Sequence, residues 1–361
     1  MKTEKAVPKY MELAKWINDQ IRENKLQAGQ KLYSENELRE MFGVSRQTVR
    51  RATNMLEQEG ILRSVRGSGT YINDNRQAIL TQKKRVAVIT TYVDGYIFPR
   101  MIQGIENVLL QSGYSVQIAF TNNQHGREKT ILEDVLSRDE VSGIVAETTK
   151  SALPNPNLKL YQEIMRRRIP ILFMNSFYPE LTVPHVSIND HLAGYEMTNY
   201  LIRKGHRRIA GIFKLDDLQG RIRYAGYVEA MSEAGLGIDD TKILWLDTMD
   251  IRQMEKQTAR VLERSIDCTA LFCYNDEVAY GVLDILKKSG IRVPQDLSIV
   301  SVDNANLSMM GETGITTFPH PMEELGKKAS ENLLRMIRDP FFDANYEFDA
   351  KIIERDSVRR L

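Results

Sequence analysis

Residues 34–60 read SENELREMFGVSRQTVRRATNMLEQEG, and this stretch decides the fold of the amino-terminal region. Ser34 and Glu37 have the spacing of a capping box, in which each side chain satisfies a backbone N–H at the start of a helix. Gly43 can adopt the positive φ that ends a helix, and Ser45 can cap the helix that follows. The stretch therefore predicts a short helix, a tight turn and a longer second helix, which together form a helix-turn-helix.

The sequence on either side of this motif supplies the rest of a small domain. Upstream, apolar residues recur at helical spacing from Tyr10 to Glu23. Downstream, the segments Ile61–Val65 and Thr70–Ile72 flank a glycine-containing turn, which is typical of a β-hairpin. We therefore expect a winged helix-turn-helix domain over residues 1–72.

The second helix of the motif, from Arg46 to Gln58, has a polar face suited to DNA. Its outer positions carry Arg46, Gln47, Arg50 and Arg51. Residues 1–85 contain 17 lysines and arginines against 10 acidic residues, a net charge of +7, whereas the remainder of the chain has a net charge of −6. A basic head on an acidic body favours nucleic-acid binding by the head. A solvated helix face is the alternative for Arg50 and Arg51.

The head resembles the GntR family of bacterial repressors. The resemblance rests on Ser45-Arg-Gln-Thr-Val-Arg50, on the Leu56 to Gly60 spacing, and on Gly67-x-Gly-Thr-Tyr71. It implies DNA contacts by Lys9, Glu35, Asn36, Ser45, Arg46, Gln47, Thr48, Arg50, Arg66 and Gly67. Family members usually have arginine where this chain has Asn36. Glu35 could instead be a carboxylate that favours the start of its helix.

The remainder of the chain has the rhythm of an α/β fold. Residues 73–84 are polar and are predicted to be a linker, and residues 85–361 alternate short apolar runs with helical stretches. The runs are Val86–Ile89, Val116–Phe120, Gly143–Ala146, Ile171–Met174, Ile209–Phe213, Ile243–Leu246, Ala270–Cys273 and Ile299–Val302. Such runs indicate parallel sheets covered on both faces. One barrel or two doubly wound lobes could result, and a restart of the pattern near Asp190 favours two lobes.

Polar and aromatic residues follow the predicted strands in both halves of the body. Ligands in open α/β sheets bind beyond the carboxyl ends of the strands. The candidate ligand-binding residues at these ends are Tyr92, Tyr96, Phe98, Glu147, Lys150, Asn175, Gln219, Arg223, Asn275 and Asp303. Amides, carboxylates and cations can chelate hydroxyls while aromatic rings cover C–H faces, so this set suits a small polyol.

Structural roles are the alternative for several of these residues. Arg223 could simply pair with a carboxylate, and Glu147 could form a local ion pair with Lys150. Asn275 or Asp276 could cap the following helix. The three aromatic residues could belong to the core.

The body resembles the sugar-sensing core of LacI/GalR-type regulators. The resemblance rests on the segments Leu201–Ile209, Gly220–Tyr227, Tyr274–Ala279 and Pro294–Asp303. It implies a two-lobed body like a periplasmic binding protein, with effector contacts by Arg223, Asn275 and Asp303. With the segments Thr90–Tyr92, Tyr96–Pro99, Thr149–Leu153 and Cys273–Glu277, the whole chain is similar to the bacterial L-arabinose-responsive repressors, which implies L-arabinose as the effector. Residues 73–84 lack the small-residue hinge helix of the LacI pattern, so induction by melting such a helix is not expected.

The remaining features exclude other classes of protein. The chain contains no nucleophile elbow, P-loop or dinucleotide fingerprint, and its histidines and two cysteines lack metal-ligand spacing. No apolar run is long enough to span a membrane, and the amino terminus lacks a signal-peptide core. We therefore expect a cytoplasmic homodimer without cofactor or enzymatic activity, a repressor that leaves its operator when it binds sugar. A sugar sensor for another monosaccharide with no direct DNA role is the alternative.

Overall fold

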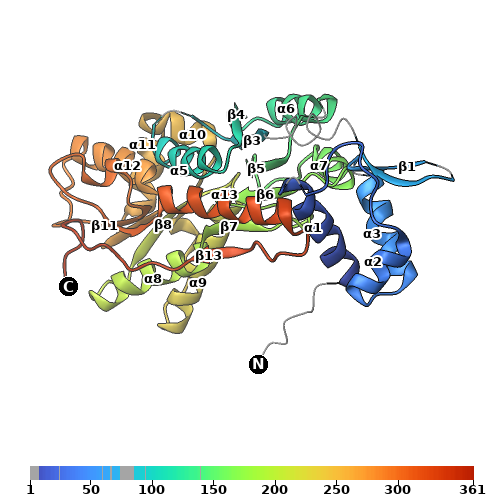
Figure 1. Cartoon of the computed structure of the whole chain (residues 1–361). Helices are drawn as coiled ribbons and strands as arrows, with labels where there is room; N and C mark the ends of the chain where they lie inside the picture. The colour runs from blue at the N-terminus through green and yellow to red at the C-terminus, as the bar shows by residue number, and fades with distance from the viewer. Residues whose placement is uncertain are drawn as a thin grey trace. The chain divides into compact units, whose positions relative to one another are not determined.

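The computed structural model describes residues 8–23, 25–58, 60–65, 67–73, 85–93, 95–138 and 140–361. The chain divides into two compact units, Met1–Lys84 and Arg85–Leu361. Figure 1 draws the described residues of the first in blue and those of the second from cyan through green and yellow to red. No helix in the described ranges is long and apolar enough to cross a membrane.

The first unit is a winged helix-turn-helix, as predicted. Its elements are α1 (Lys9–Arg22), α2 (Glu35–Phe42), α3 (Arg46–Gln58), β1 (Leu62–Val65) and β2 (Gly69–Ile72). The capping box at Ser34 and Glu37 is formed, and Gly43 ends α2 with a φ of 58°. Strands β1 and β2 pair antiparallel as the wing. The apolar faces of the three helices pack together around Leu38 and Val49, which are buried.

The first lobe of the second unit is a six-stranded parallel sheet with helices on both faces. In spatial order its strands are β13 (Tyr346–Phe348), β7 (His185–Ile188), β6 (Ile171–Met174), β5 (Gly143–Glu147), β3 (Arg85–Thr90) and β4 (Ser115–Phe120). Its helices are α5 (Phe98–Gln111), α6 (His125–Ser137), α7 (Leu158–Arg166) and α13 (Met322–Arg338). Two apolar clusters, one on each face of the sheet, form its core.

The second lobe is a five-stranded parallel sheet, also covered on both faces. Its strands in spatial order are β12 (Thr316–Pro319), β11 (Ser298–Asp303), β10 (Ala270–Cys273), β8 (Ile209–Lys214) and β9 (Ile243–Leu246). Its helices are α8 (Asp190–Arg203), α9 (Leu218–Glu233), α10 (Thr248–Arg252), α11 (Thr258–Ser265) and α12 (Asp276–Lys288), with 3-10 turns at Asp240–Lys242, Met254–Gln257 and Asn306–Met309. Two separate sheets confirm the two-lobed interpretation over the single barrel.

The chain crosses between the lobes after β7, after β12 and after β13. Helix α8 packs in the second lobe, α13 returns to the first, and the carboxyl-terminal tail pairs Ile353 with Thr317 of β12. Strands β7 and β13 lie at one edge of the first sheet, and β12 lies at one edge of the second. All three crossovers therefore lie at the same side of the unit, and β4 and β9 form the edges remote from them.

Candidate functional site

The first candidate site is the exposed face of α3 in the first unit. The Ser45 hydroxyl caps this helix by accepting the backbone N–H of Thr48 at 3.2 Å. Glu35 of α2 accepts hydrogen bonds from Arg46 Nε at 2.6 Å and from Arg50 Nε at 2.8 Å. These bonds, from Arg50 first and then Arg46, lower the pKa of the Glu35 carboxyl. Glu35 thus holds two solvent-exposed guanidinium groups on one side of α3.

The other predicted DNA-contacting residues have varied surroundings. Gln47 and Lys9 are exposed on their helices, and Gly67 has a φ of 80° beyond β1. The Asn36 amide oxygen accepts a hydrogen bond from Arg39 at 3.4 Å. Arg66 lies outside the described residues. DNA contact by all ten residues stays a prediction.

The second candidate site is a cavity of about 360 Å³ between the lobes of the second unit. Eight predicted residues line it: Tyr92, Tyr96, Phe98, Glu147, Gln219, Arg223, Asn275 and Asp303. Other lining residues, not among the predicted set, include Lys214, Asp217, Arg252, Tyr274 and His320. Most of the lining follows the carboxyl ends of strands in both sheets, where a ligand is expected in this architecture.

Arg223 on α9 is the buried cation of the cavity, with an exposed fraction of 1%. Its Nε lies 2.8 Å from Asp190, one Nη donates to the Tyr274 carbonyl at 2.7 Å, and the other lies 3.4 Å from Asp303. Burial raises the pKa of Asp190 to about 6, although Arg223 opposes that shift. Arg223 therefore both pairs with carboxylates and lines the cavity, so the two interpretations of this residue coexist.

Glu147 at the end of β5 is the main acceptor that the first lobe contributes. Its carboxylate accepts the Thr91 N–H at 2.7 Å and the Asn175 amide N–H at 2.8 Å. Burial raises the pKa of this carboxyl despite those bonds. Asn175 itself does not line the cavity. Its amide nitrogen donates to the Glu147 carboxylate and so helps to fix the orientation of that side chain.

His320, beside the crossover after β12, joins this network from the other side. Its Nε2 lies 3.0 Å from the Asn175 amide oxygen, which makes Nε2 the donor when the Asn175 amide nitrogen faces Glu147. Burial lowers the pKa of His320 to about 4, so the ring is neutral near pH 7. Its Nδ1 is buried without a hydrogen-bond partner among the described residues, and it can accept from a hydroxyl.

Asp303 and Asn275 come from neighbouring strand ends of the second lobe. Asp303 has a φ of 111°, a conformation that costs backbone energy, and it accepts a hydrogen bond from the Tyr96 hydroxyl. The Asn275 side chain accepts the Val278 N–H at 3.0 Å and so caps α12. The choice of cap between Asn275 and Asp276, open in the sequence, therefore falls on Asn275.

The aromatic residues form one wall of the cavity. The rings of Tyr92 and Phe98 meet edge to face with centroids 5.4 Å apart, and Arg252 of α10 lies 5.2 Å from the Tyr92 ring. Phe98 also packs in the core of the first lobe. Its predicted ligand-facing position and its core alternative are thus both compatible with the structure.

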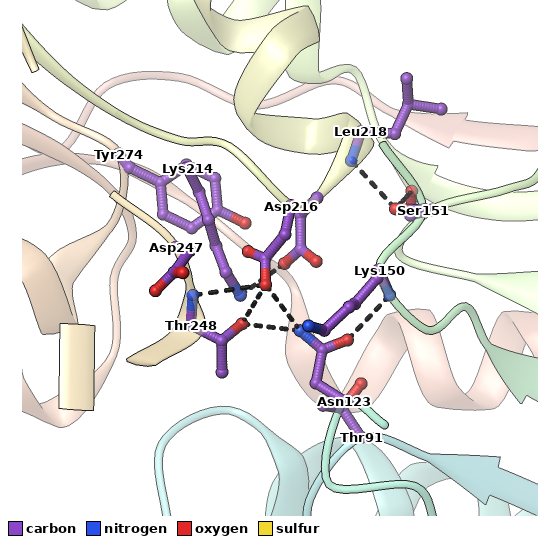
Figure 2. A network of polar contacts seen from close by, with 12 residues as sticks. Thr91, Asn123, Lys150, Ser151, Lys214, Asp216, Leu218, Asp247, Thr248 and Tyr274 are labelled. Carbon is purple, nitrogen blue, oxygen red and sulfur yellow. Dashed lines mark hydrogen bonds and ion pairs between the residues drawn. The ribbon is translucent and has the colours of Figure 1, made fainter. Parts of the chain in front are cut away.

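Lys150 does not line the cavity. Its backbone N–H donates to the Asn123 amide oxygen at 2.8 Å, within the group of residues that Figure 2 draws. The alternative of an ion pair between Lys150 and Glu147 is absent from the contacts of the described residues.

Lys214 lines the cavity but is not among the predicted residues. The sequence could have indicated it, because it is a polar residue at the end of the apolar strand β8. Burial disfavours its charged form, but the carboxylate of Asp217, 2.7 Å away, outweighs this effect and raises the pKa of the Lys214 ammonium. Arg252 has no such signal, since it lies on a helix after the strand. The lining thus offers paired charges and no cluster of metal ligands in the described part of the chain.

Family models match the two units separately, and curated relatives match nearly the whole chain. Residues 9–72 match the family described as bacterial regulatory proteins, gntR family, and residues 198–358 match the periplasmic binding protein-like domain. The arabinose metabolism transcriptional repressor of Geobacillus stearothermophilus is 36% identical over 99% of this chain and 100% of the relative. The repressor of the same description from Halalkalibacterium halodurans is 37% identical over 96% of this chain and 93% of the relative.

The fold of the second unit has solved counterparts. The crystal structure of transcription regulator CcpA of Lactococcus lactis superimposes with a TM-score of 0.69 and 26% identity, over 77% of this chain and 100% of that one.

Proposed function

The chain belongs to the family of the arabinose metabolism transcriptional repressors, and from this premise we propose that L-arabinose in the interlobe cavity releases it from operator DNA. The chain is a DNA-binding transcriptional repressor with a regulatory rather than an enzymatic role. Its proposed targets are genes of arabinose or pentose utilisation, and its proposed state is a cytoplasmic homodimer without cofactor.

The observation that carries the proposal is that both lobes line one cavity with paired donors and acceptors. Glu147 comes from the first lobe, whereas Arg223 and Asp303 come from the second. A neutral sugar presents hydroxyls that donate and accept at once, so it can satisfy carboxylates and a guanidinium together. The rings of Tyr92 and Phe98 would cover its C–H face.

Sugar binding would act on DNA through closure of the lobes. A ligand that contacts both lobes binds the closed form better and shifts the population toward it. Operator binding by a dimer requires two heads spaced about 34 Å apart, one helical turn of DNA. If closure changes that spacing, sugar and operator compete, and a coupling of about 1–3 kcal/mol, or roughly 5–150-fold, suffices for induction.

The head would bind DNA through α3 in the major groove. Arg46 and Arg50 can each donate two hydrogen bonds to a guanine, and Gln47 can bond an adenine. The hydroxyls of Ser45 and Thr48 can bond phosphates. Glu35 holds both arginines in place before DNA arrives. That arrangement supports α3 as the recognition helix.

A mobility-shift titration tests the proposal. Promoter fragments of arabinose-utilisation genes from the same genome are titrated with the full chain, with and without L-arabinose, D-xylose and D-ribose. We expect retention of a promoter fragment at moderate salt, and loss of that retention with L-arabinose at lower concentration than with the other pentoses. Retention that only another sugar relieves would change the effector, and no retention of any fragment would overturn the proposal.

A further inference from the structure

A second set of polar contacts joins the two lobes beside the sugar cavity. Asn123 of the first lobe donates through its amide nitrogen to the Thr248 hydroxyl at 2.7 Å, and that hydroxyl donates to Asp216 at 2.7 Å. Ser151 of the first lobe accepts the Leu218 N–H at 2.9 Å. Figure 2 shows these five residues in one cluster. We call Asn123, Ser151, Asp216, Leu218 and Thr248 the latch.

The strand order places the Asn123–Thr248 contact of the latch at the side of the cleft remote from the crossovers. Asn123 follows β4, and Thr248 follows β9, and these are the edge strands farthest from β7, β13 and β12. Because the three crossovers already hold the lobes together on one side, a contact on the opposite side decides whether the cleft can open. The Asn123–Thr248 bond is such a contact.

Each half of the latch is held in place within its own lobe. The Asn123 amide oxygen accepts the Lys150 N–H at 2.8 Å, which aims the amide nitrogen at the second lobe. In the second lobe, Asp216 accepts both the backbone N–H and the hydroxyl of Thr248. The Thr248 hydroxyl donates its one proton to Asp216 and accepts the Asn123 amide N–H with a lone pair. Every donor in the series from Asn123 to Asp216 therefore has an acceptor.

Burial strengthens the hydrogen bonds of the latch, while one unpaired buried oxygen limits their net gain, so the latch can open. Asn123, Asp216 and Thr248 are exposed by only 2%, 3% and 8%, so water competes poorly for their bonds. One oxygen of Asp216 is buried without a partner among the described residues, which costs free energy in the closed form. The balance of these two effects permits opening.

The latch also shares an element with the sugar cavity. Leu218 is the first residue of α9, whose initial N–H groups have no partner within the helix, and Ser151 satisfies one of them. Arg223, which lines the cavity, lies on the same helix. A change of lobe closure at the latch therefore moves the helix that carries Arg223.

We propose that the latch stabilises the closed form of the lobes, so that part of the sugar-free population is already closed, and thereby sets the affinity for the effector. Only a closed cleft brings groups of both lobes to one ligand, so the apparent dissociation constant rises as the closed population falls. The part of this inference that concerns the effector rests on the proposed function, whereas the part that concerns closure does not.

The test is a distance measurement between the lobes of the sugar-free full chain. Spin labels are placed at Lys129→Cys on α6 and at Glu255→Cys in the Met254–Gln257 turn, both exposed, with Cys268→Ser to remove the half-buried thiol. Pulsed electron resonance should give a short-distance population beside a longer-distance one for this parent protein. Asn123→Ala and Thr248→Val should each diminish the short-distance population in favour of the longer distance.

Asn122→Ala is the matched control. Asn122 and Asn123 have φ values of 50° and 55°, so alanine is strained equally at both, but only Asn123 bridges the lobes. The same loss of the short-distance population in Asn122→Ala, an unchanged distribution in both latch variants, or a parent protein with no short-distance population would each overturn the latch. Circular dichroism confirms that each variant is folded.

Calorimetry with L-arabinose tests the effector part separately. Asn123→Ala should weaken binding by roughly 2- to 10-fold, as expected for the loss of one hydrogen bond. Unchanged affinity alongside an opened cleft would refute the link to affinity. If the parent protein itself does not bind L-arabinose, the proposed function fails while the distance result still decides the latch.

Discussion

Arg223 illustrates how one buried residue can link stability to the proposed recognition of the effector. Its guanidinium is 1% exposed and faces two carboxylates, Asp190 and Asp303. Removing one partner of a buried ion pair leaves an uncompensated charge, which costs about 3–5 kcal/mol. Arg223→Ala should therefore lower the free energy of unfolding of the second unit by about this amount, in addition to abolishing the response to sugar.

Urea unfolding followed by Trp245 fluorescence measures this effect. Trp16 and Trp245 are the two tryptophans, and Trp16→Phe leaves Trp245 to report on the second unit. Arg203→Ala is the control, because Arg203 is exposed and its ion pair with Glu196 spans 3.5 Å. Equal small losses for the two variants would show that Arg223 has no special role in stability.

His320 gives a prediction about pH. Its pKa is about 4 in the folded protein because of burial, against 6.5 for an ordinary histidine. Between these values the unfolded chain binds more protons, so the contribution of His320 to stability is complete above pH 6.5 and is lost as the pH falls. At pH 5 the loss should be about 2 kcal/mol.

The comparison of the parent protein with His320→Gln isolates this term. Asp190 and Asp276, whose pKa values burial raises to about 6 and about 7, act with the opposite sign and titrate in both proteins. Glutamine keeps a donor for Asn175 but does not titrate. If the parent protein loses no stability relative to His320→Gln between pH 7 and pH 5, a neutral buried imidazole at position 320 is contradicted.

At this scale the sequence predicts positions better than contacts. The strand-end rule found Glu147 and Asp303, because a polar residue after an apolar run is visible in the sequence. It also selected Asn175 and Lys150, which follow strands equally well but do not line the cavity. The direction of a side chain depends on its backbone conformation and neighbours, which spacing does not encode.

Among the elements, α3 gives the most direct test of DNA recognition. Arg46 is exposed and held by Glu35, so its side chain is available to a base edge. A bidentate contact to guanine is worth about 1–3 kcal/mol, so Arg46→Ala should weaken operator binding about 10-fold or more. Its affinity for L-arabinose should not change, because the cavity lies in the other unit.

Fluorescence anisotropy on the operator measures the loss. Lys25→Ala removes the same charge from the exposed turn after α1 and controls for general electrostatics. Equal losses for the two variants would mean that Arg46 acts only through its charge.

The apolar strands were predictable, the edge strands β4 and β9 among them, whereas the more polar strands beside the crossovers were not. The runs at β6 and β10 are uniformly apolar because both faces of those strands are covered, so they stand out in the sequence. Strands β7, β12 and β13 contain His185, Thr316, Thr317 and Glu347, and their short mixed runs resemble loops. These missed strands are also the ones next to the crossovers, of which the restart of the pattern near Asp190 marks the first.

The whole molecule presents an apolar edge that bears on its proposed assembly. Strand β4 is an edge strand, and Ile118 and Phe120 on it are exposed by 39% and 44%. Leu110, near the end of α5, is exposed by 55%. Exposed apolar edge strands are liabilities that proteins usually cover. The sequence could not select this face, because apolar residues of a strand look the same whether a helix covers them or not.

We therefore predict that β4 contributes to the homodimer interface. Phe120→Glu places a charge on that edge, so the variant should sediment as a monomer in analytical ultracentrifugation where the parent protein sediments as a dimer. Phe341→Glu is the control, since Phe341 is exposed by 69% and lies beyond α13. The monomer should keep its affinity for L-arabinose, because the cavity belongs to one chain, but it should lose operator affinity, because two half-sites need two linked heads. A dimeric Phe120→Glu protein, or a monomeric Phe341→Glu protein, would place the interface elsewhere.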